Sequence, residues 1–387
     1  MTTRLATKAP AGNTASAIDR AWSLSRQFSR SAAEHDRAGK LPVENFKALA
    51  DAGLLSLTVP RDAGGEGAGL ALAAEVIGIL ARGEPSTALV LAMHYINHAV
   101  VILNWPASFR DRLRRDSLAG GGLINALRVE PELGTPARGG LPATIARRGD
   151  GGWSLSGHKI YSTGIPVLGW LAVWARTDEA DPRTGAFLVP TNVPGIEIRP
   201  TWRQLGMRAT ESHDVILNDV QIPLDHAVDV RRPTAWARAD GELAWTTLLI
   251  GALYDGIARA AQDWLAGFLR SRVPSNLGAS LATLPRVQEA MGEIEALLIA
   301  NRRLLRSVAE DADRGLPPAS TESGIVKSIV TTNAIAAVEI ALKLTGNHGL
   351  AQGNPLERHY RDVLCGRIHT PQDDVVRIAA GKLALSI

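Results

Sequence analysis

Cysteine, long basic runs and net charge are nearly absent from this sequence. Cys365 is the single cysteine among 387 residues, which excludes an internal disulfide framework and a cysteine-based zinc site. The 42 Lys and Arg residues nearly balance the 39 Asp and Glu residues, and no run of Lys or Arg is longer than two. We therefore expect a cytoplasmic protein that binds neither nucleic acid nor a metal ion.

The common nucleotide-binding and hydrolase motifs are missing as well. The sequence contains no G-x-x-x-x-G-K-[ST] and no G-x-S-x-G motif, and the glycines between positions 64 and 69 do not complete G-x-G-x-x-G. No alternation of strands and helices surrounds these glycines. A Rossmann site is therefore disfavoured, and the glycines are expected to form a loop.

One stretch, residues 87–105, lacks charge and is long enough to suggest a membrane span. It contains the polar residues His94, Asn97, His98 and Asn104, which are costly in a bilayer. We expect a buried core helix and no association with a membrane.

Three patterns of apolar and polar residues follow one another along the chain and together predict an α+β protein. Apolar residues recur at helical spacing from 17 to about 118, after a polar segment 1–16 that is expected to be disordered. Short apolar runs between Gly, Asp and Pro fill 119–232, which predicts an antiparallel β-barrel or sandwich. Long helical patterns return from 233 to 387, including 243–272, 284–311 and 320–344, which predicts a helix bundle.

Two polar segments are candidates for chemistry. His94 and His98 are one helical turn apart, but no third ligand is evident, so two packed or substrate-facing histidines are favoured over a metal pair. In "RDVLCGRIHTPQDD", Pro371 interrupts a helical pattern just after His369 and Thr370. This segment is interpreted either as a functional loop or as a loop that caps the last helix.

Several segments, in order along nearly the whole chain, resemble motifs of the acyl-CoA dehydrogenase superfamily of flavoproteins. They are "VPRDAGGEG", "VEPELGTP", "GHKIYSTG", "LGMRATESHDVILNDVQIP", "GNHGL" and "NPLERHYRD". The resemblance implies a helical domain over 17–118, a β-barrel over 119–232 and a four-helix bundle within 233–387.

The resemblance also implies a flavin between the barrel and the bundle, with FAD or FMN as cofactor and diffusible reduced flavin as one source of it. The family pattern places three groups of residues at the flavin: the loop residues Glu130, Gly134 and Thr135; the turn Tyr161, Ser162 and Thr163; and Arg272, Gly346, Gly349, Gln372 and Asp374 from the bundle. Arg272 is expected at a pyrophosphate across a subunit interface, which implies a homodimer or homotetramer.

The catalytic base of the family's dehydrogenases is missing at both usual positions. Alignment on the surrounding motifs puts Thr370 at the loop position and Thr246 at the helix position, and neither hydroxyl removes an α-proton at neutral pH. Glu242 would serve only if the alignment were displaced by one helical turn.

The His369 loop resembles the monooxygenase branch of the superfamily, of the dibenzothiophene monooxygenase and nitrososynthase types. That branch uses reduced flavin from a separate reductase and O₂, and it needs no deprotonating Glu. We therefore expect His369, Thr370 and His94 at the reacting centre and a small molecule as substrate. Two alternatives remain: a dehydrogenase of acyl-CoA with a displaced base such as Glu242, Asp373 or Asp374, and a homologue that binds flavin or an acyl group without turnover.

Overall fold

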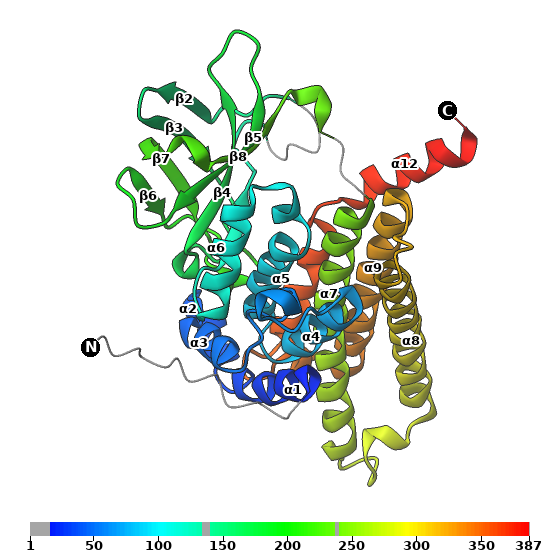
Figure 1. Cartoon of the computed structure of the whole chain (residues 1–387). Helices are drawn as coiled ribbons and strands as arrows, with labels where there is room; N and C mark the ends of the chain where they lie inside the picture. Colours follow the sequence, from blue (N-terminus) through cyan, green and yellow to red (C-terminus); the bar gives the residue numbers. More distant parts are fainter. Residues whose placement is uncertain (1–15, 134–139, 237–239, 387) are drawn as a thin grey trace.

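The computed structural model describes residues 16–133, 140–236 and 240–386, which form a helical unit, a β-sheet unit and a second helical unit in chain order (Figure 1). The predicted disordered segment 1–16 lies outside the described residues except for Ser16. The first unit consists of helices α1 (Ala17–Phe28), α2 (Ala32–Ala38), α3 (Val43–Asp51), α4 (Leu70–Gly83), α5 (Pro85–Ala99) and α6 (Ala107–Leu118).

Local capping explains where these first helices begin. The Ser16 hydroxyl accepts a hydrogen bond from the Asp19 N–H, and the Asp19 carboxylate accepts one from the Ser16 N–H, which together form a capping box. At the start of α5, the Glu84 carboxylate accepts hydrogen bonds from the N–H groups of Ser86 and Thr87. Helix α5 therefore begins directly after α4, without a loop between them.

Helix α5 contains residues 87–99 of the uncharged stretch 87–105 for which a buried helix is predicted, and the stretch continues into a short 3₁₀ helix, Val101–Asn104. Thirteen of the 15 residues of α5 are buried in the protein. Pro85–Asn104 and α9 (Ser320–Thr345) are long and apolar enough to cross a membrane by length and composition, but 72% and 56% of their apolar windows are buried inside the molecule. Burial against other elements accounts for the apolar character of both helices.

The middle unit is a single mixed sheet of short strands. Its strands are β1 (Ile124–Leu127), β2 (Ile145–Gly149), β3 (Gly152–Lys159), β4 (Trp170–Thr177), β5 (Thr184–Pro190), β6 (Ile196–Arg199), β7 (Asp214–Ile222) and β8 (Ala227–Arg231). The hydrogen-bonded order is β6-β7-β3-β2-β4-β5-β8, with β1 also paired to β4. Apolar side chains of β4 and β5 are buried nearly throughout, so these two strands carry the core of the sheet.

Two pairings in the sheet differ from the antiparallel arrangement predicted from the sequence. Strands β1 and β2 both pair with β4 in parallel and share one of its edges, β1 along Trp170–Val173 and β2 along Arg176–Thr177. Neither strand is joined to β4 by a hairpin turn, and the longer connections allow the chain to enter β4 in the same direction.

The last unit is built around helix α7. Its elements are α7 (Asp240–Ser271), α8 (Pro285–Asp313), α9, the short α10 (Asn347–Leu350), α11 (Leu356–Leu364) and α12 (Asp373–Leu385). Helix α7 packs against α4, α5, α8, α9 and α11, and one long stretch of it is almost entirely buried. It therefore joins the two helical units into one body, while α12 projects from the end of α9 (Figure 1).

The sheet unit is attached to the last unit at the loop before β7. The Met207 N–H donates to Asp362 Oδ1 on α11 at 2.6 Å, and Arg361 donates to the Leu205 carbonyl at 3.0 Å. Arg361 also forms an ion pair with Asp36 of α2. One turn of α11 thus holds all three units together and sets the position of the sheet over the bundle.

Candidate active site

The first group of residues predicted at the flavin lies in the turn that follows β3. Tyr161 has a φ of +58°, in the left-handed region that a tyrosine rarely adopts. Its side chain is 54% exposed and meets the Trp202 ring edge to face, with ring centres 6.1 Å apart. The strained backbone presents an aromatic face to the outside of the sheet, where a planar ring can lie against it.

Three hydroxyl groups next to Tyr161 form a chain. Thr210 Oγ1 lies 2.8 Å from Ser212 Oγ, and Ser212 Oγ donates to Thr163 Oγ1 at 3.0 Å. Thr163 accepts from Ser212, and its own hydroxyl donates to the Tyr161 carbonyl at 3.5 Å, a long and therefore weak bond that a better-placed acceptor on a ligand can replace.

The neighbouring Ser162 hydroxyl is buried and has no hydrogen-bond partner in the described part of the chain. A buried polar atom of this kind is rare in a finished protein interior, and it is the sort of group that a bound ligand satisfies. The turn at residues 161–163 therefore fits the flavin-contacting role that the sequence predicts for it.

Glu130 and Lys159 form an ion pair beneath this turn. Lys159 Nζ lies 2.6 Å from Glu130 Oε1, and the two side chains are 0% and 2% exposed. Burial lowers the pKa of Lys159 to about 8, against the effect of Glu130. Burial acts to raise the pKa of Glu130, but Lys159 and hydrogen bonds from Thr144 and Ala143 hold it below its ordinary value.

The Glu130 side chain, which is predicted to contact a flavin, is enclosed by protein groups. Its carboxylate is surrounded by Lys159, Thr144 and the Ala143 N–H, so it fixes the backbone on either side of the loop. The other residues predicted in this loop, Gly134 and Thr135, lie outside the described residues.

The second group of candidate residues lies in the loop between α11 and α12. His369 Nδ1 lies 2.5 Å from the hydroxyl of Tyr254 on α7. Burial, and to a smaller extent Lys327, lower the pKa of His369 to about 4. Burial raises the pKa of Tyr254. Both side chains are therefore neutral at pH 7, and Thr370 follows His369 in the same loop.

A buried lysine holds this loop in place. Lys327, on α9, is 0% exposed, and its ammonium group donates to the carbonyl oxygens of Gly366, His369 and Pro371 at 2.9, 2.9 and 3.1 Å. These three bonds use the three donors of an ammonium group. The backbone on both sides of the His369 side chain is thus fixed to α9.

His94 takes a packed position within the first helical unit. Its Nδ1 accepts from the Ile124 N–H at 3.3 Å, and its Nε2 lies 3.2 Å from the Leu55 carbonyl and 3.3 Å from Ser117 Oγ. Burial lowers its pKa to about 4. With both ring nitrogens engaged by protein groups, the neutral imidazole connects α5 to the start of β1.

The predicted flavin residues of the bundle divide between its two ends. Arg272 is exposed just past the end of α7, and the ring of Phe268, one turn earlier, lies 5.3 Å from the ring of His348, between Gly346 and Gly349. Gln372 caps α12 and Asp374 is exposed in its first turn, close to the loop that Lys327 holds.

The two groups are far apart within one chain. From Lys327 to Thr345, α9 advances by 18 residues, or about 27 Å. Arg272 and the 346–349 segment therefore do not converge with the His369 loop in a single chain. A contribution of Arg272 to the same flavin would have to come from a partner subunit, which is what the family resemblance implies.

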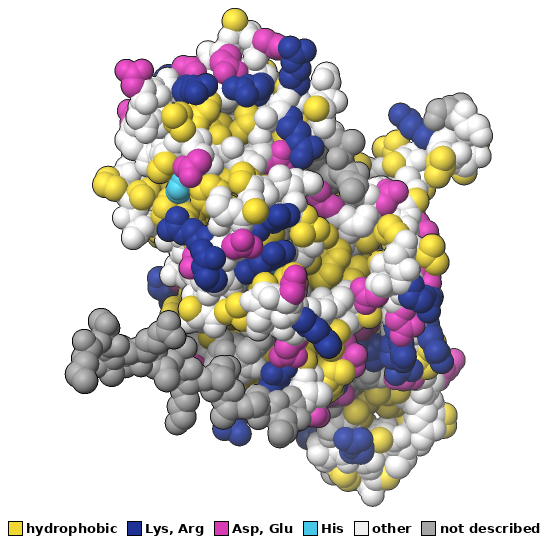
Figure 2. Space-filling view, in the orientation of Figure 1, with side chains coloured by type: hydrophobic (Ala, Val, Ile, Leu, Met, Phe, Trp, Pro, Cys, Tyr) yellow, Lys and Arg dark blue, Asp and Glu magenta, His cyan; other side chains and the backbone are white. Residues whose placement is uncertain are grey.

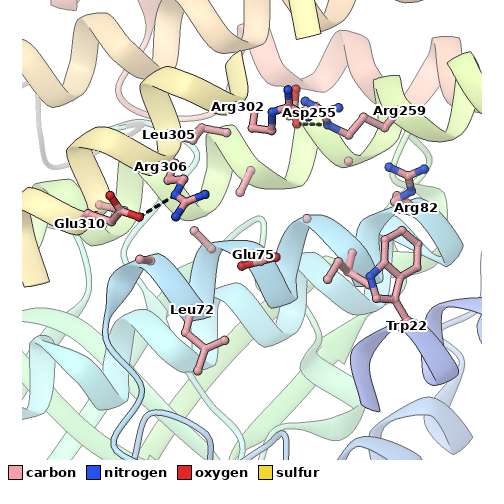
Figure 3. Close-up of a pocket in the computed structure, with 17 residues that line it drawn as sticks. Trp22, Leu72, Glu75, Arg82, Asp255, Arg259, Arg302, Leu305, Arg306 and Glu310 are labelled. Atoms are coloured by element: carbon pink, nitrogen blue, oxygen red, sulfur yellow. Dashed lines mark hydrogen bonds and ion pairs between the residues drawn. The ribbon is translucent and has the colours of Figure 1, made fainter. Parts of the chain in front are cut away.

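A separate cavity of about 450 Å³ lies between α1 and α4 on one side and α7 and α8 on the other (Figure 3). Figure 3 shows Arg82 and Trp22 on one wall and Arg302 and Arg306 on the other, with Glu75 between them. None of the site residues predicted from the sequence lines this cavity. It is distinct from the Tyr161 turn and the His369 loop.

Tyr254 and Lys327 are the residues of this site that sequence reasoning missed. Tyr254 lies inside a continuous apolar helix, where nothing in the local sequence separates it from a core tyrosine. Lys327 did leave a trace, because it is a single charge within the apolar run "GIVKSIV". A lone lysine in a buried helix needs a partner, and its partner is found only in the folded chain.

A helical unit, a sheet and a helix bundle in chain order, with an exposed aromatic turn on the sheet and a histidine loop after α11, fit a three-domain flavin-dependent oxidoreductase. Comparison with known proteins agrees with this class. Residues 23–106, 128–220 and 248–373 match the N-terminal, middle and C-terminal domains of acyl-CoA dehydrogenase. The chain belongs to the acyl-CoA dehydrogenase family.

The proteins similar to this chain are named both as dehydrogenases and as nitrososynthases. YdbM of Bacillus subtilis, which bears the name of an acyl-CoA dehydrogenase, is 34% identical over 357 residues, covering 91% of this chain and 92% of YdbM. The L-evernosamine nitrososynthase of Micromonospora is 28% identical, covering 94% and 87%. The solved structure of KijD3 with FMN and a dTDP-linked amino sugar has a TM-score of 0.84 and 29% identity, covering 96% of this chain and 93% of KijD3.

Proposed function

We propose that this protein is an oxygen-transferring member of the family, which uses reduced flavin and O₂ to oxidise a small molecule. The observation that carries the proposal is the loop at the junction of the domains. It holds His369 against Tyr254, while the two positions used by the family's carboxylate base carry Thr370 and Thr246. A site without a carboxylate base is not equipped to remove the α-proton of a thioester.

The carboxylates nearby are poorly placed to replace that base. Glu242 precedes Tyr254 by 12 residues on α7, or about 18 Å along the helix axis. Asp373 faces the Lys327 ammonium at 3.7 Å, and Asp374 is exposed. These positions favour the oxygen-transferring assignment over a displaced base.

The residues present fit a bound flavin. The Tyr161 ring offers a face for the planar ring system, and the Thr163 hydroxyl, which accepts from Ser212, would turn its hydrogen from the Tyr161 carbonyl to the ligand. When bound, the reduced flavin supplies the electrons that activate O₂. His369 would hold a hydrogen-bond donor on the opposite side, and Arg272 of a second subunit would meet a pyrophosphate if the flavin is FAD.

The proposal implies several partners. A separate flavin reductase would provide reduced flavin, because no second redox centre is evident in the sequence. The names of the nitrososynthase and of the KijD3 complex favour an amine or a similar nucleophilic centre on a small substrate. A cytoplasmic homodimer or homotetramer would complete the site.

A second candidate is an acyl-CoA dehydrogenase with an unusual base, favoured by the name of YdbM, which is 34% identical to this chain. In that case the flavin and the substrate would have to lie near the start of α7, within reach of a carboxylate such as Glu242. The two candidates predict opposite responses to a thioester.

The test has two arms. Oxidised flavin bound to the protein is first mixed without air with butyryl-CoA, octanoyl-CoA and palmitoyl-CoA; we expect its absorbance to remain unchanged, and bleaching would establish a dehydrogenase. The protein with photoreduced FMN is then mixed with ¹⁸O₂ and indole, thioanisole or a dTDP-linked amino sugar. Mass spectrometry should find ¹⁸O in an oxidised product, and its absence with all three probes would argue against the proposal.

A further inference from the structure

The donor of the hydrogen bond between Tyr254 and His369 can be deduced from the surroundings of the two side chains. The hydroxyl oxygen and Nδ1 are 2.5 Å apart, so one of the two groups donates to the other. If Tyr254 donates, Nδ1 is bare and Nε2 carries the imidazole hydrogen. If Nδ1 donates, Nε2 is bare and the phenolic hydrogen must go elsewhere.

The surroundings of Tyr254 decide between the two arrangements. Its side chain is 0% exposed, and its hydroxyl has no hydrogen-bond partner other than His369 in residues 16–133, 140–236 and 240–386. A buried phenolic hydrogen without an acceptor would lose its hydrogen bond to water and gain no other, which costs free energy. Tyr254 therefore donates to Nδ1, and the hydrogen of the neutral imidazole lies on Nε2.

The position of that imidazole is set by a different residue. Lys327 binds the carbonyl oxygen of His369 itself, as well as those of Gly366 before it and Pro371 after it. With the backbone held by Lys327 and Nδ1 held by Tyr254, the ring retains little freedom, and Nε2 points away from α7.

We propose that Tyr254 and Lys327 are positioning residues that present the Nε2–H of His369 to the reacting centre as a fixed hydrogen-bond donor. This inference rests on the proposed function only in treating that loop as part of the reacting centre. Tyr254 sets which nitrogen carries the hydrogen, and Lys327 sets where that nitrogen lies. Neither residue needs to touch the substrate.

The tautomer is tested without flavin or substrate, by ¹⁵N NMR of the full chain labelled at histidine near pH 7. The His369 resonances are those lost in His369→Gln. We expect a Nδ1 shift typical of an unprotonated nitrogen and a Nε2 shift typical of a protonated one. A protonated Nδ1 in the unmodified protein would overturn the assignment of the tautomer.

Tyr254→Phe removes the donor and keeps the ring. Both His369 shifts should move toward intermediate values, since nothing then selects one tautomer. Tyr95→Phe is the matched control, because Tyr95 is also 0% exposed and donates to a backbone carbonyl, that of Leu54, at 2.5 Å. Unchanged shifts in Tyr254→Phe, or equal changes in Tyr95→Phe, would contradict the role of Tyr254.

Lys327→Met and the milder Lys327→Gln, which retains amide donors, test the second residue. Both should broaden or split the His369 resonances, the glutamine variant less. Unaltered resonances in both would remove Lys327 from the proposal. In flavin-loaded protein, Tyr254→Phe should lower product formation about tenfold relative to Tyr95→Phe. If the unmodified protein transfers no oxygen, the proposed function fails while the NMR result still decides the positioning roles.

Discussion

Two fully buried lysines support the candidate site, and the charge of each is compensated by different partners. Lys159 is neutralised by the Glu130 carboxylate beneath the Tyr161 turn. Lys327 relies mainly on three backbone carbonyls, with Asp373 3.7 Å away. A buried charge with full hydrogen bonding is tolerated, but removal of either partner leaves the other without compensation.

Lys159→Met is expected to lower the free energy of unfolding by about 3–5 kcal/mol, because it leaves Glu130 as an unpaired buried carboxylate. Urea denaturation measures the change. Lys47→Met is the control, since Lys47 and Asp51 form an exposed pair at 77% and 67% exposure, and the expected loss there is below about 1 kcal/mol. Similar losses in both variants would show that the Glu130 pair is not a structural element.

His94 predicts a dependence of stability on acid. Its pKa is about 4 in the folded protein and ordinarily 6.5, so between these values the unfolded chain binds a proton that the folded chain refuses. Stability is therefore lost as the pH falls from 6.5 toward 4, by about 3 kcal/mol from this residue alone.

The measurement is the free energy of unfolding at several pH values between 6.5 and 4, for the unmodified protein and for His94→Gln. The variant should show a flatter dependence, with the remaining slope contributed by other histidines of lowered pKa, such as His359 and His369. Equal slopes in the two proteins would mean that His94 is charged or exposed in solution.

Helices α4 and α7 cross so closely that their contact requires glycine at the crossing point. A Cβ on Gly256 would overlap the carbonyl oxygen of Gly78 and come within 2.9 Å of Ala81. The backbones meet where no side chain separates them, and both glycines line the cavity of Figure 3. This crossing sets how the first helical unit lies against the bundle.

Gly256→Ala is expected to destabilise the protein by about 1–3 kcal/mol, because the helices must separate to admit a methyl group. Gly267→Ala, on the same helix with nothing within 4 Å of its Cβ, should instead stabilise by up to about 1 kcal/mol through helix propensity. Thermal unfolding of the two variants should shift in opposite directions. A shift in the same direction would show that α4 and α7 are not in close contact.

The flavin site of the proposed function would be shared between two chains. The His369 loop lies near Lys327 of α9, and Arg272 with the 346–349 segment lies near the Thr345 end, about 27 Å away along the helix. A homo-oligomer would bring the second end of one chain to the first end of another. The expected arrangement thus links assembly to cofactor binding.

Arg272→Ala should weaken FAD binding by about 10-fold to 100-fold and leave FMN binding nearly unchanged, since only FAD has the pyrophosphate that a guanidinium would pair with. Titration calorimetry with each flavin gives the two dissociation constants. Equal losses for both flavins would rule out the pyrophosphate contact.

The assembly itself is a further expectation. Helix α12 exposes Ile378, Leu383 and Leu385 at 59%, 68% and 70%, and Figure 2 shows apolar side chains along this projecting helix. Ile299 of α8 and Ile329 of α9 are each 40% exposed. We expect a dimer or tetramer built on the bundle, and sedimentation of a lone monomer at micromolar concentration would contradict both the interface and the shared flavin site.

Local structure was determined by the sequence alone. The helical patterns over 243–272, 284–311 and 320–344 correspond closely to α7, α8 and α9, because hydrophobic periodicity and capping act within a few residues. The resemblance of the motifs also led to the family, whose three domains match the chain in order. The same resemblance places Thr246 and Thr370 where the family's dehydrogenases carry their carboxylate base.

Only the tertiary structure decided which distant residues meet. Tyr254 and His369 are 115 positions apart, and Lys327 and Pro371 are 44 apart, so no local pattern records their hydrogen bonds. The same holds for His94, whose two ring nitrogens are engaged by Ile124, Leu55 and Ser117 from three other segments. Periodicity identifies a buried face, but burial alone does not name the partner, because partners are chosen by how the elements pack.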